Sequence, residues 1–233
     1  PQEYLKVVNE AGYEGFRILI FASDLVGPPP PRESAFKINL PFRINMMIAI
    51  ILADLLHVAE CAPRPRVHDR ELLEQTLGQC EEELLRAFTS RLYLFKLPGV
   101  LARASARLAA LPRRDVALPL TFVTGEFFAN LAHNEGNYNL RRFIADEGCE
   151  AIPGMFTQRI LYDNWRRTKE AERGLKYTTD KKEIRRWKKS LRKQRFSTKV
   201  IKYFYRWYRK AFHPEAFGGR AEIHDLNHLA ELA

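Results

Sequence analysis

Positive charge is concentrated in one part of this 233-residue chain. Residues 159–210 contain 20 Lys and Arg against five Asp and Glu, a net charge of +15, whereas the whole chain carries +10. The remaining residues therefore carry a net charge of −5. A basic segment next to a mildly acidic body predicts surface helices whose Lys and Arg side chains extend into water.

Aromatic residues are interleaved with the basic residues between 181 and 210. This pattern is typical of a nucleic-acid groove or of a surface-active helix. A helix that packs its aromatic side chains inward gives the same pattern, and the helical spacing favours this second interpretation. The phosphate groups of a nucleotide-like ligand could use the same charges. The residues that we expect to pack inward are Ile184, Trp187, Leu191, Val200, Tyr203, Phe204 and Trp207.

The composition excludes several classes of protein. Hydrophobic residues make up 46% of the chain, which is enough for a substantial buried core. The three cysteines are too few and too widely spaced for a disulfide scaffold or a zinc or redox motif, so we expect a reducing, cytoplasmic compartment. The longest apolar run, residues 44–58, is shorter than the roughly 20 residues that cross a bilayer. We therefore expect no membrane span.

The first residues read as the middle of a helix. The chain begins at Pro1, without a Met and without the charged and apolar regions of a signal peptide. We therefore expect a segment of a longer polypeptide.

Three short apolar runs have the length and composition of strands. They are residues 16–22, 118–124 and 149–152, and the last two flank a helical pattern at 137–147 that stops at Gly148. A strand, a helix and a strand in this order form a βαβ unit, whose strands are parallel. We predict an α/β fold, namely a Rossmann-like parallel sheet with helical insertions and a long basic C-terminal helical region.

The other apolar patterns repeat at helical spacing. We divide the chain into residues 1–112, a helix-rich portion with one core strand that ends a preceding α/β subdomain, and residues 113–233. The second part is predicted to be an α/β subdomain with a basic helical extension at 156–212. The helices that we expect cover residues 2–11, 42–59, 68–90, 94–111, 156–212 and 221–232, with breaks near Pro98 and near 177–180.

A ligand cleft is predicted at the end of the strand at 118–124, because α/β folds bind ligands at the carboxyl ends of their strands. Gly125 would let the backbone approach a ligand, and Glu126 could accept hydrogen bonds from it. His133 follows in the next loop, and Asn137 and Asn139 open the next helix, where free N–H groups suit an anion. A turn glycine, a helix-capping Glu and an ordinary Asn cap would explain the same residues.

The sequence predicts no metal site and identifies no catalytic residue. His224 and His228 are four residues apart, but no third ligand is evident, so we interpret them as solvated or capping histidines. Cys80 lies on the apolar side of the helix predicted at 68–90, which favours a small buried side chain over a reactive thiol.

Several blocks of sequence occur in an order that matches a known family. They are residues 11–21, Thr124-Gly125-Glu126-Phe127-Phe128, residues 135–143, Glu147-Gly148-Cys149-Glu150, residues 160–165 and residues 213–219. In this order they resemble the 2-hydroxyacyl-CoA dehydratase superfamily. Specifically, the chain resembles part of the 2-hydroxyglutaryl-CoA dehydratase D-component-like domain of large CoA-substrate-specific enzyme activases.

The resemblance implies a Rossmann-like domain in an iron–sulfur lyase system of anaerobic metabolism, which dehydrates 2-hydroxyacyl-CoA by ATP-driven radical chemistry. It implies an acyl-CoA ligand, a 4Fe-4S cluster, and an ATP-dependent activase or another dehydratase subunit as partner. We place the family's cluster cysteines before Pro1 and after Ala233, outside this segment. Two alternatives remain open: a non-catalytic docking domain of the same family, and a nucleic-acid-binding module that uses the basic helices 181–210.

Overall fold

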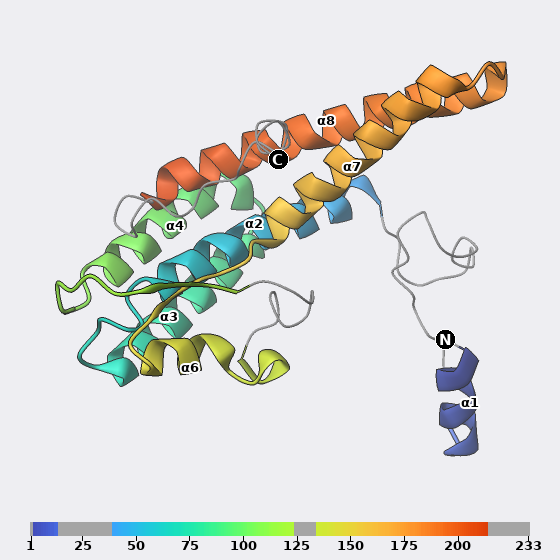
Figure 1. Ribbon diagram of the computed structural model, residues 1–233. Helices are drawn as coiled ribbons and strands as arrows, with labels where there is room; N and C mark the ends of the chain where they lie inside the picture. The colour runs from blue at the N-terminus through green and yellow to red at the C-terminus, as the bar shows by residue number, and fades with distance from the viewer. Residues whose placement is uncertain (1, 14–38, 124–133, 214–233) are drawn as a thin grey trace. The chain divides into compact units, whose positions relative to one another are not determined.

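The computed structural model describes residues 2–13, 39–123 and 134–213. The chain divides into two compact units, Pro1–Ile44 and Asn45–Ala233, and each is considered by itself. In the first unit, α1 (Gln2–Glu10) is followed by Gly12, whose φ of 84° is in the left-handed region. The helix predicted at 2–11 is therefore confirmed, and Gly12 ends it. The second unit is mostly helical (Figure 1).

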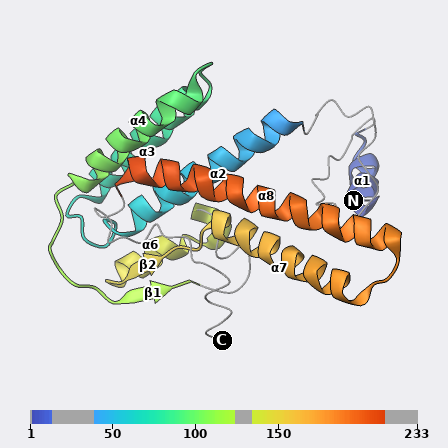
Figure 2. The ribbon, with the colours of Figure 1, turned by 90° about the horizontal axis from the view of Figure 1, so that it is seen from above.

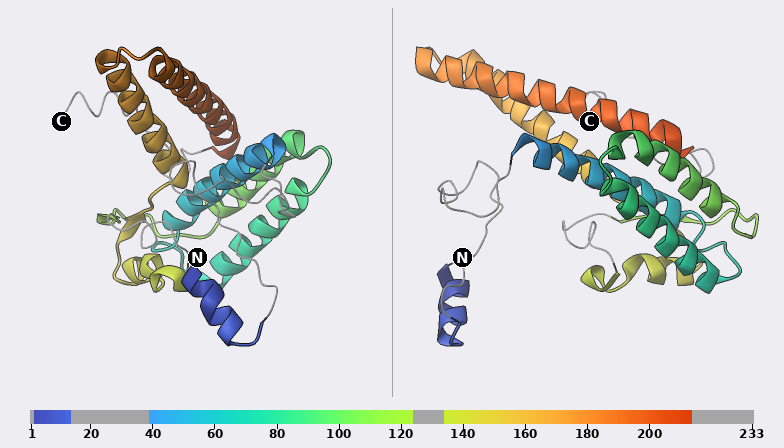
Figure 3. Two further views of the ribbon diagram at one scale, coloured as in Figure 1. Left: turned by 90° about the vertical axis from the view of Figure 1, so that its right-hand side faces the viewer. Right: turned by 180° about the vertical axis from the view of Figure 1, so that it is seen from behind.

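Three helices supply most of the apolar core: α2 (Leu40–Cys61), α3 (Arg70–Phe88) and α4 (Tyr93–Ala109). α3 and α4 lie side by side (Figure 3). Asp69 caps α3 by accepting a hydrogen bond from the Leu72 N–H at 3.0 Å. The fully buried side chains of the three helices include Ile48, Ile51, Leu55, Leu73, Cys80, Leu97, Leu101 and Leu108. Cys80 is thus a buried core residue, as predicted.

α4 is continuous, so the break predicted near Pro98 is wrong. A proline inside a helix removes one backbone hydrogen bond and costs about 3 kcal/mol. Leu97 and Leu101 on either side of Pro98 are fully buried, and burying them offsets that cost.

α7 (Phe156–Tyr177) and α8 (Lys181–Phe212) form an antiparallel hairpin (Figure 2). The predicted helical extension and its break near 177–180 are confirmed. Asp180 caps α8 by accepting a hydrogen bond from the Lys182 N–H at 3.0 Å. The helices approach closely at Gly174, where an added Cβ would lie 2.5 Å from the Trp187 indole, so this position requires glycine.

A small β-sheet packs beside the helices. β1 (Leu120–Phe122) and β2 (Glu150–Ile152) are parallel, with Thr121 opposite Ala151. Between them lie the 3₁₀ turn η1 (Asn134–Asn137) and α6 (Leu140–Asp146). The local strand, helix and parallel strand were therefore predicted correctly. We call residues 118–152, as far as they are described, the β1–α6–β2 unit.

The predicted Rossmann-like fold is wrong. Within the described residues the sheet has two strands of three residues each, and helices make up most of the structure. β1 is not covered on both faces, since Leu120 and Phe122 are 54% and 64% exposed. A short apolar run is compatible with a buried strand or with an edge segment, and here the helices bury most of the apolar surface. The strand predicted at 16–22 lies outside the described residues.

α8 packs as a helix with one buried side. In its first half the predicted residues Ile184, Trp187 and Leu191 are half-buried, whereas in its second half the fully buried residues differ from those predicted. Ile201, Tyr205, Tyr208 and Phe212 are buried, and α8 contacts α4 and α7. Tyr203, which we expected to pack inward, is 67% exposed. The side of α8 that we predicted to face inward is rotated about the helix axis from the side that is buried. Basic residues flank both sides, so the aromatic residues alone do not determine which side packs inward.

α2 is long and apolar enough to cross a membrane by length and composition, in contrast to the shorter run expected from the sequence. Half of its most apolar window is buried inside the protein, and the core helix of a soluble protein has the same composition.

Candidate functional site

The structure places two of the five predicted cleft residues. Asn137 ends η1 and is buried, whereas Asn139 is exposed and precedes α6 in the left-handed conformation, with a φ of 55° and no side-chain capping bond. α6 has seven residues, too few to supply a strong helix-terminal field for an anion. Gly125, Glu126 and His133 lie outside the described residues, as do His224 and His228.

A buried ion pair joins β2 to the turn that follows α2. The Arg66 guanidinium donates to Glu150 Oε2 at 2.6 Å, and the Glu150 side chain is 1% exposed. Arg66 also donates to the Ala62 carbonyl at 2.7 Å and to the Val116 carbonyl at 3.2 Å. One arginine therefore connects the helices, the segment before β1 and β2.

Further charged contacts surround this ion pair. Arg64 lies between Glu60 and Glu74, with nitrogen–oxygen distances of 2.6 Å to each. Burial alone would lower the pKa of Arg64, but the two carboxylates outweigh burial and raise it. Arg70 pairs with Asp146 at the end of α6. Ion pairs thus attach the β1–α6–β2 unit to α3 and to the turn after α2, beside the small apolar cluster that Cys61 of α2 forms with Ile144 and Ala151.

Asp54 is a second buried acid that the sequence reading did not single out as functional. Its two oxygens accept the N–H groups of Phe156 and Thr157 at 2.8 Å and 2.7 Å, which caps the N-terminus of α7 from α2. Burial raises the pKa of Asp54 above its ordinary value, although the hydrogen bonds from Thr157 and Phe156 oppose this. The sequence signal that could have identified Asp54 is its place as a single acid within an apolar run. Burying a carboxylate costs free energy unless hydrogen-bond donors accompany it.

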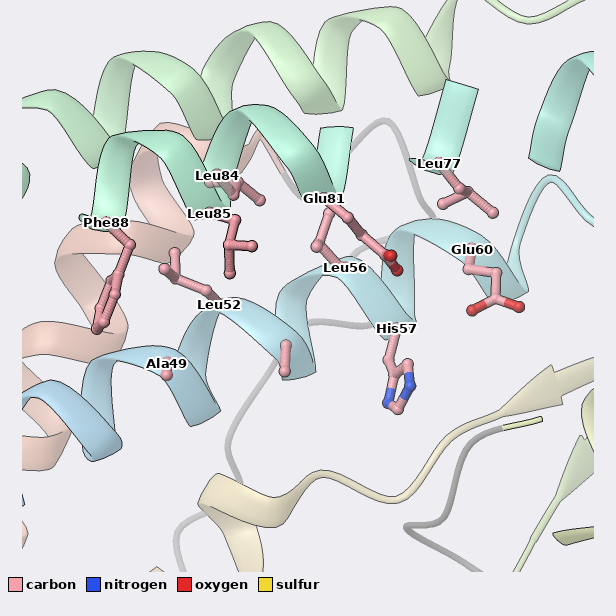
Figure 4. Close-up of a pocket in the computed structure, with 11 residues that line it drawn as sticks. Ala49, Leu52, Leu56, His57, Glu60, Leu77, Glu81, Leu84, Leu85 and Phe88 are labelled. Carbon is pink, nitrogen blue, oxygen red and sulfur yellow. The ribbon is translucent and has the colours of Figure 1, made fainter. Parts of the chain in front are cut away.

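An apolar groove of about 560 Å³ lies between α2 and α3 (Figure 4). Leu52 and Leu56 of α2 face Leu84 and Leu85 of α3, and Phe88 lies near the end formed by Ala49. Toward the other end are His57, Glu60 and Glu81. The Glu81 carboxylate there disfavours a phosphate-bearing ligand, whereas the charge of Glu60 is compensated by Arg64.

α8 carries a second hollow, of about 430 Å³, on its solvent side. The residues that line it are Lys199, Lys202, Tyr203, Arg206, Trp207 and Lys210. Four cations and two aromatic rings suit an anion with a flat face that can stack. The sequence had indicated this composition but not which aromatic residues stay exposed.

The cysteines of this chain do not fit a 4Fe-4S cluster. Such a cluster takes four cysteine thiolates, and the chain has three cysteines. Cys80 is buried between α3 and α4, whereas Cys61 forms a small cluster with Ile144 and Ala151, against which Cys149 packs. Burial raises the pKa of Cys80, which opposes the thiolate form that binds metal. The described residues also include no group of three His, Cys, Asp or Glu side chains placed to hold a metal.

Comparison of the chain with protein-family models, with curated proteins and with solved structures finds no match.

Proposed function

We propose that the chain is a segment of a 2-hydroxyacyl-CoA dehydratase or activase-type protein, and that this segment binds acyl-CoA and contacts a partner subunit. The ordered blocks of family-like sequence support this proposal. Because the three cysteines do not fit a cluster, electron transfer is assigned to no residue of this chain.

The parallel pairing of β1 with β2 is the observation that carries the proposal. It places Glu150, the last residue of the family-like block Glu147–Glu150, opposite Leu120 at the start of β1. The carboxyl ends of parallel strands lie at the same edge of a sheet, where α/β proteins bind ligands. In sequence, Gly125 and Glu126 follow β1 closely. They remain the predicted ligand-binding residues.

Calorimetric titration with lactoyl-CoA tests this function. We expect binding by the intact chain, and about tenfold weaker binding by Glu126→Gln, because that change removes one charged hydrogen-bond acceptor. Glu82→Gln is the matched control, since Glu82 is exposed on α3 and lies outside the family-like blocks, and it should bind as the unchanged chain does. Absence of lactoyl-CoA binding, or an equal loss in both variants, contradicts the proposal.

The cysteine arrangement favours a second candidate, a non-catalytic docking domain of the same family. This candidate predicts a stable complex with the ATP-dependent activase but no heat of binding with lactoyl-CoA. Size-exclusion chromatography of the mixture with that activase distinguishes the two.

A further inference from the structure

The solvent side of α8 carries an exposed stripe of alternating cations and aromatic rings, which has no place in the acyl-CoA proposal. Phe196 and Tyr203 are 71% and 67% exposed. Exposed basic residues lie before, between and after them at intervals of three or four, so that all six share one side of the helix. We call this set the α8 stripe: Arg192, Phe196, Lys199, Tyr203, Arg206 and Lys210.

The charge of the α8 stripe is not neutralised by acids of its own helix. After Glu183 in its first turn, α8 contains no Asp or Glu as far as its last residue, Phe212. Like charges that repel along one helix destabilise the free protein, and a polyanion that lies along them releases that repulsion. The stripe therefore favours an extended anionic partner.

The other side of α8 argues against a lipid surface as that partner. A helix that lies on a membrane inserts its apolar side into the lipid. In α8 the apolar side, with Ile201, Tyr205 and Tyr208, is at most 1% exposed and is already used in packing within the protein. The rings that stay exposed alternate with cations instead of forming an apolar side of their own.

The length of the α8 stripe argues against a single nucleotide as its whole ligand. The hollow of about 430 Å³ includes Lys199, Tyr203, Arg206 and Lys210, but the stripe continues beyond it to Phe196 and Arg192. It runs along one helix for about 27 Å, from residue 192 to residue 210 at about 1.5 Å per residue. A track of cations with exposed rings between them is how proteins bind single strands, with phosphates on the cations and bases stacked on the rings.

We infer that the α8 stripe binds single-stranded nucleic acid without sequence preference, with Phe196 and Tyr203 as stacking platforms. The four cations supply most of the affinity through contacts with phosphates. The two rings distinguish a nucleic acid from a polyanion that has no bases.

Fluorescence anisotropy of the whole chain with labelled dT20 and U20 tests this inference. The variant Lys199→Glu/Arg206→Glu should bind both strands at least tenfold more weakly and show a shallower salt dependence. Lys96→Glu/Arg103→Glu is the matched control: it has the same residue types, the same spacing of seven and exposed positions, but on α4. This control should keep its affinity within about threefold, since nonspecific charge alone changes little.

Removal of the rings tests the stacking. Phe196→Ala/Tyr203→Ala should weaken dT20 and U20 binding about tenfold and leave heparin binding unchanged, because heparin has no bases. Phe95→Ala/Tyr177→Ala, in which both rings are 77% exposed elsewhere, should change neither. The inference is overturned if the stripe variants bind as the unchanged chain does, if the α4 control loses as much, or if the ring variant loses heparin equally. Tighter, stripe-dependent binding to phosphatidylserine vesicles would also overturn it, in favour of a membrane surface.

Discussion

Two regions of this protein are held by different forces. The helical core, formed by α2, α3, α4 and the buried side of α8, consists of fully buried apolar residues such as Ile51, Leu101 and Tyr205. The β1–α6–β2 unit has a small apolar cluster and depends on the Arg66–Glu150 ion pair and its neighbours. Apolar burial is nondirectional, whereas a buried ion pair requires one partner in one place. The core should therefore unfold as a whole, while the unit should open at single contacts.

The largest expected effect is in the helical core. Leu101→Ala removes a fully buried side chain from the middle of α4 and should lower the free energy of unfolding by about 4 kcal/mol, through lost burial and the cavity left behind. Leu92→Ala, at a position 59% exposed, should change it by less than about 0.5 kcal/mol. Urea denaturation followed by circular dichroism measures both. Equal effects of the two variants would contradict the assignment of the core.

The ion pair comes next. Arg66→Met leaves the buried Glu150 carboxylate without its guanidinium and should lower the free energy of opening the β1–α6–β2 unit by about 3 kcal/mol. Adding Glu150→Leu in the same chain should restore most of this loss, because no buried charge then lacks its partner. Hydrogen exchange of the amide at position 150, which donates to the Pro119 carbonyl at 2.8 Å, measures the opening. Failure of the second change to restore protection would argue against a direct pair.

Asp54 connects α2 of the helical core to the N-terminus of α7, and its effect depends on pH. Asp54→Asn should cost about 1 kcal/mol at neutral pH, because the amide has one oxygen to accept two N–H groups. The pKa of Asp54 is raised in the folded state, so the folded protein binds its proton more tightly than the unfolded chain does. As the pH falls through the folded pKa toward the ordinary value, the parent chain should gain stability relative to the variant. Urea titrations of both proteins over this pH range measure the difference, and a constant difference would contradict it.

The smallest effect distinguishes two tyrosines of α8. Within the described part of the chain, the Tyr208 hydroxyl is buried and has no hydrogen-bond partner, so Tyr208→Phe should raise the free energy of unfolding by about 1 kcal/mol. Tyr205 donates to the Met155 sulfur at 3.3 Å, so Tyr205→Phe should give no gain.

Alkaline pH provides a second readout for Tyr208. Burial raises the pKa of Tyr208 to about 12, above the 10.0 of a free tyrosine. Between these values the unfolded chain loses the proton first, so the parent protein should lose stability that Tyr208→Phe retains. Thermal unfolding at several alkaline pH values measures this, and parallel curves for parent and variant would contradict it.

The sequence predicted the parts of the fold that depend on local patterns. The break between α7 and α8 follows from apolar spacing that stops before Asp180, a strong capping residue. The strands were harder, because the run at 118–124 is apolar enough for an inner strand, yet its described residues 118–123 are exposed or half-buried. Whether such an apolar run is buried depends on which helices or strands pack against it, and those elements are formed by residues elsewhere in the chain.

The candidate sites show the same limit. Glu150 is buried because Arg66, 84 residues earlier, reaches it, and no local pattern contains that pairing. In α8 the composition indicated both a packed side and a cationic side, but the rotation of the helix could not be fixed from the aromatic residues. Tyr203 was therefore expected in the core and is found in the exposed stripe.

In this account, apolar burial holds the helical core and ion pairing holds the β1–α6–β2 unit. Hydrogen exchange over the whole chain tests this division most directly, when it is measured in Leu101→Ala and in Arg66→Met. The account predicts that Leu101→Ala lowers protection in the helices and in the β1–α6–β2 unit alike, because the core unfolds globally. It predicts that Arg66→Met lowers protection in β2 and α6 and leaves α4 and the buried side of α8 unchanged. Loss of protection in α4 and α8 equal to that in β2 after Arg66→Met would show one cooperative unit and contradict the account.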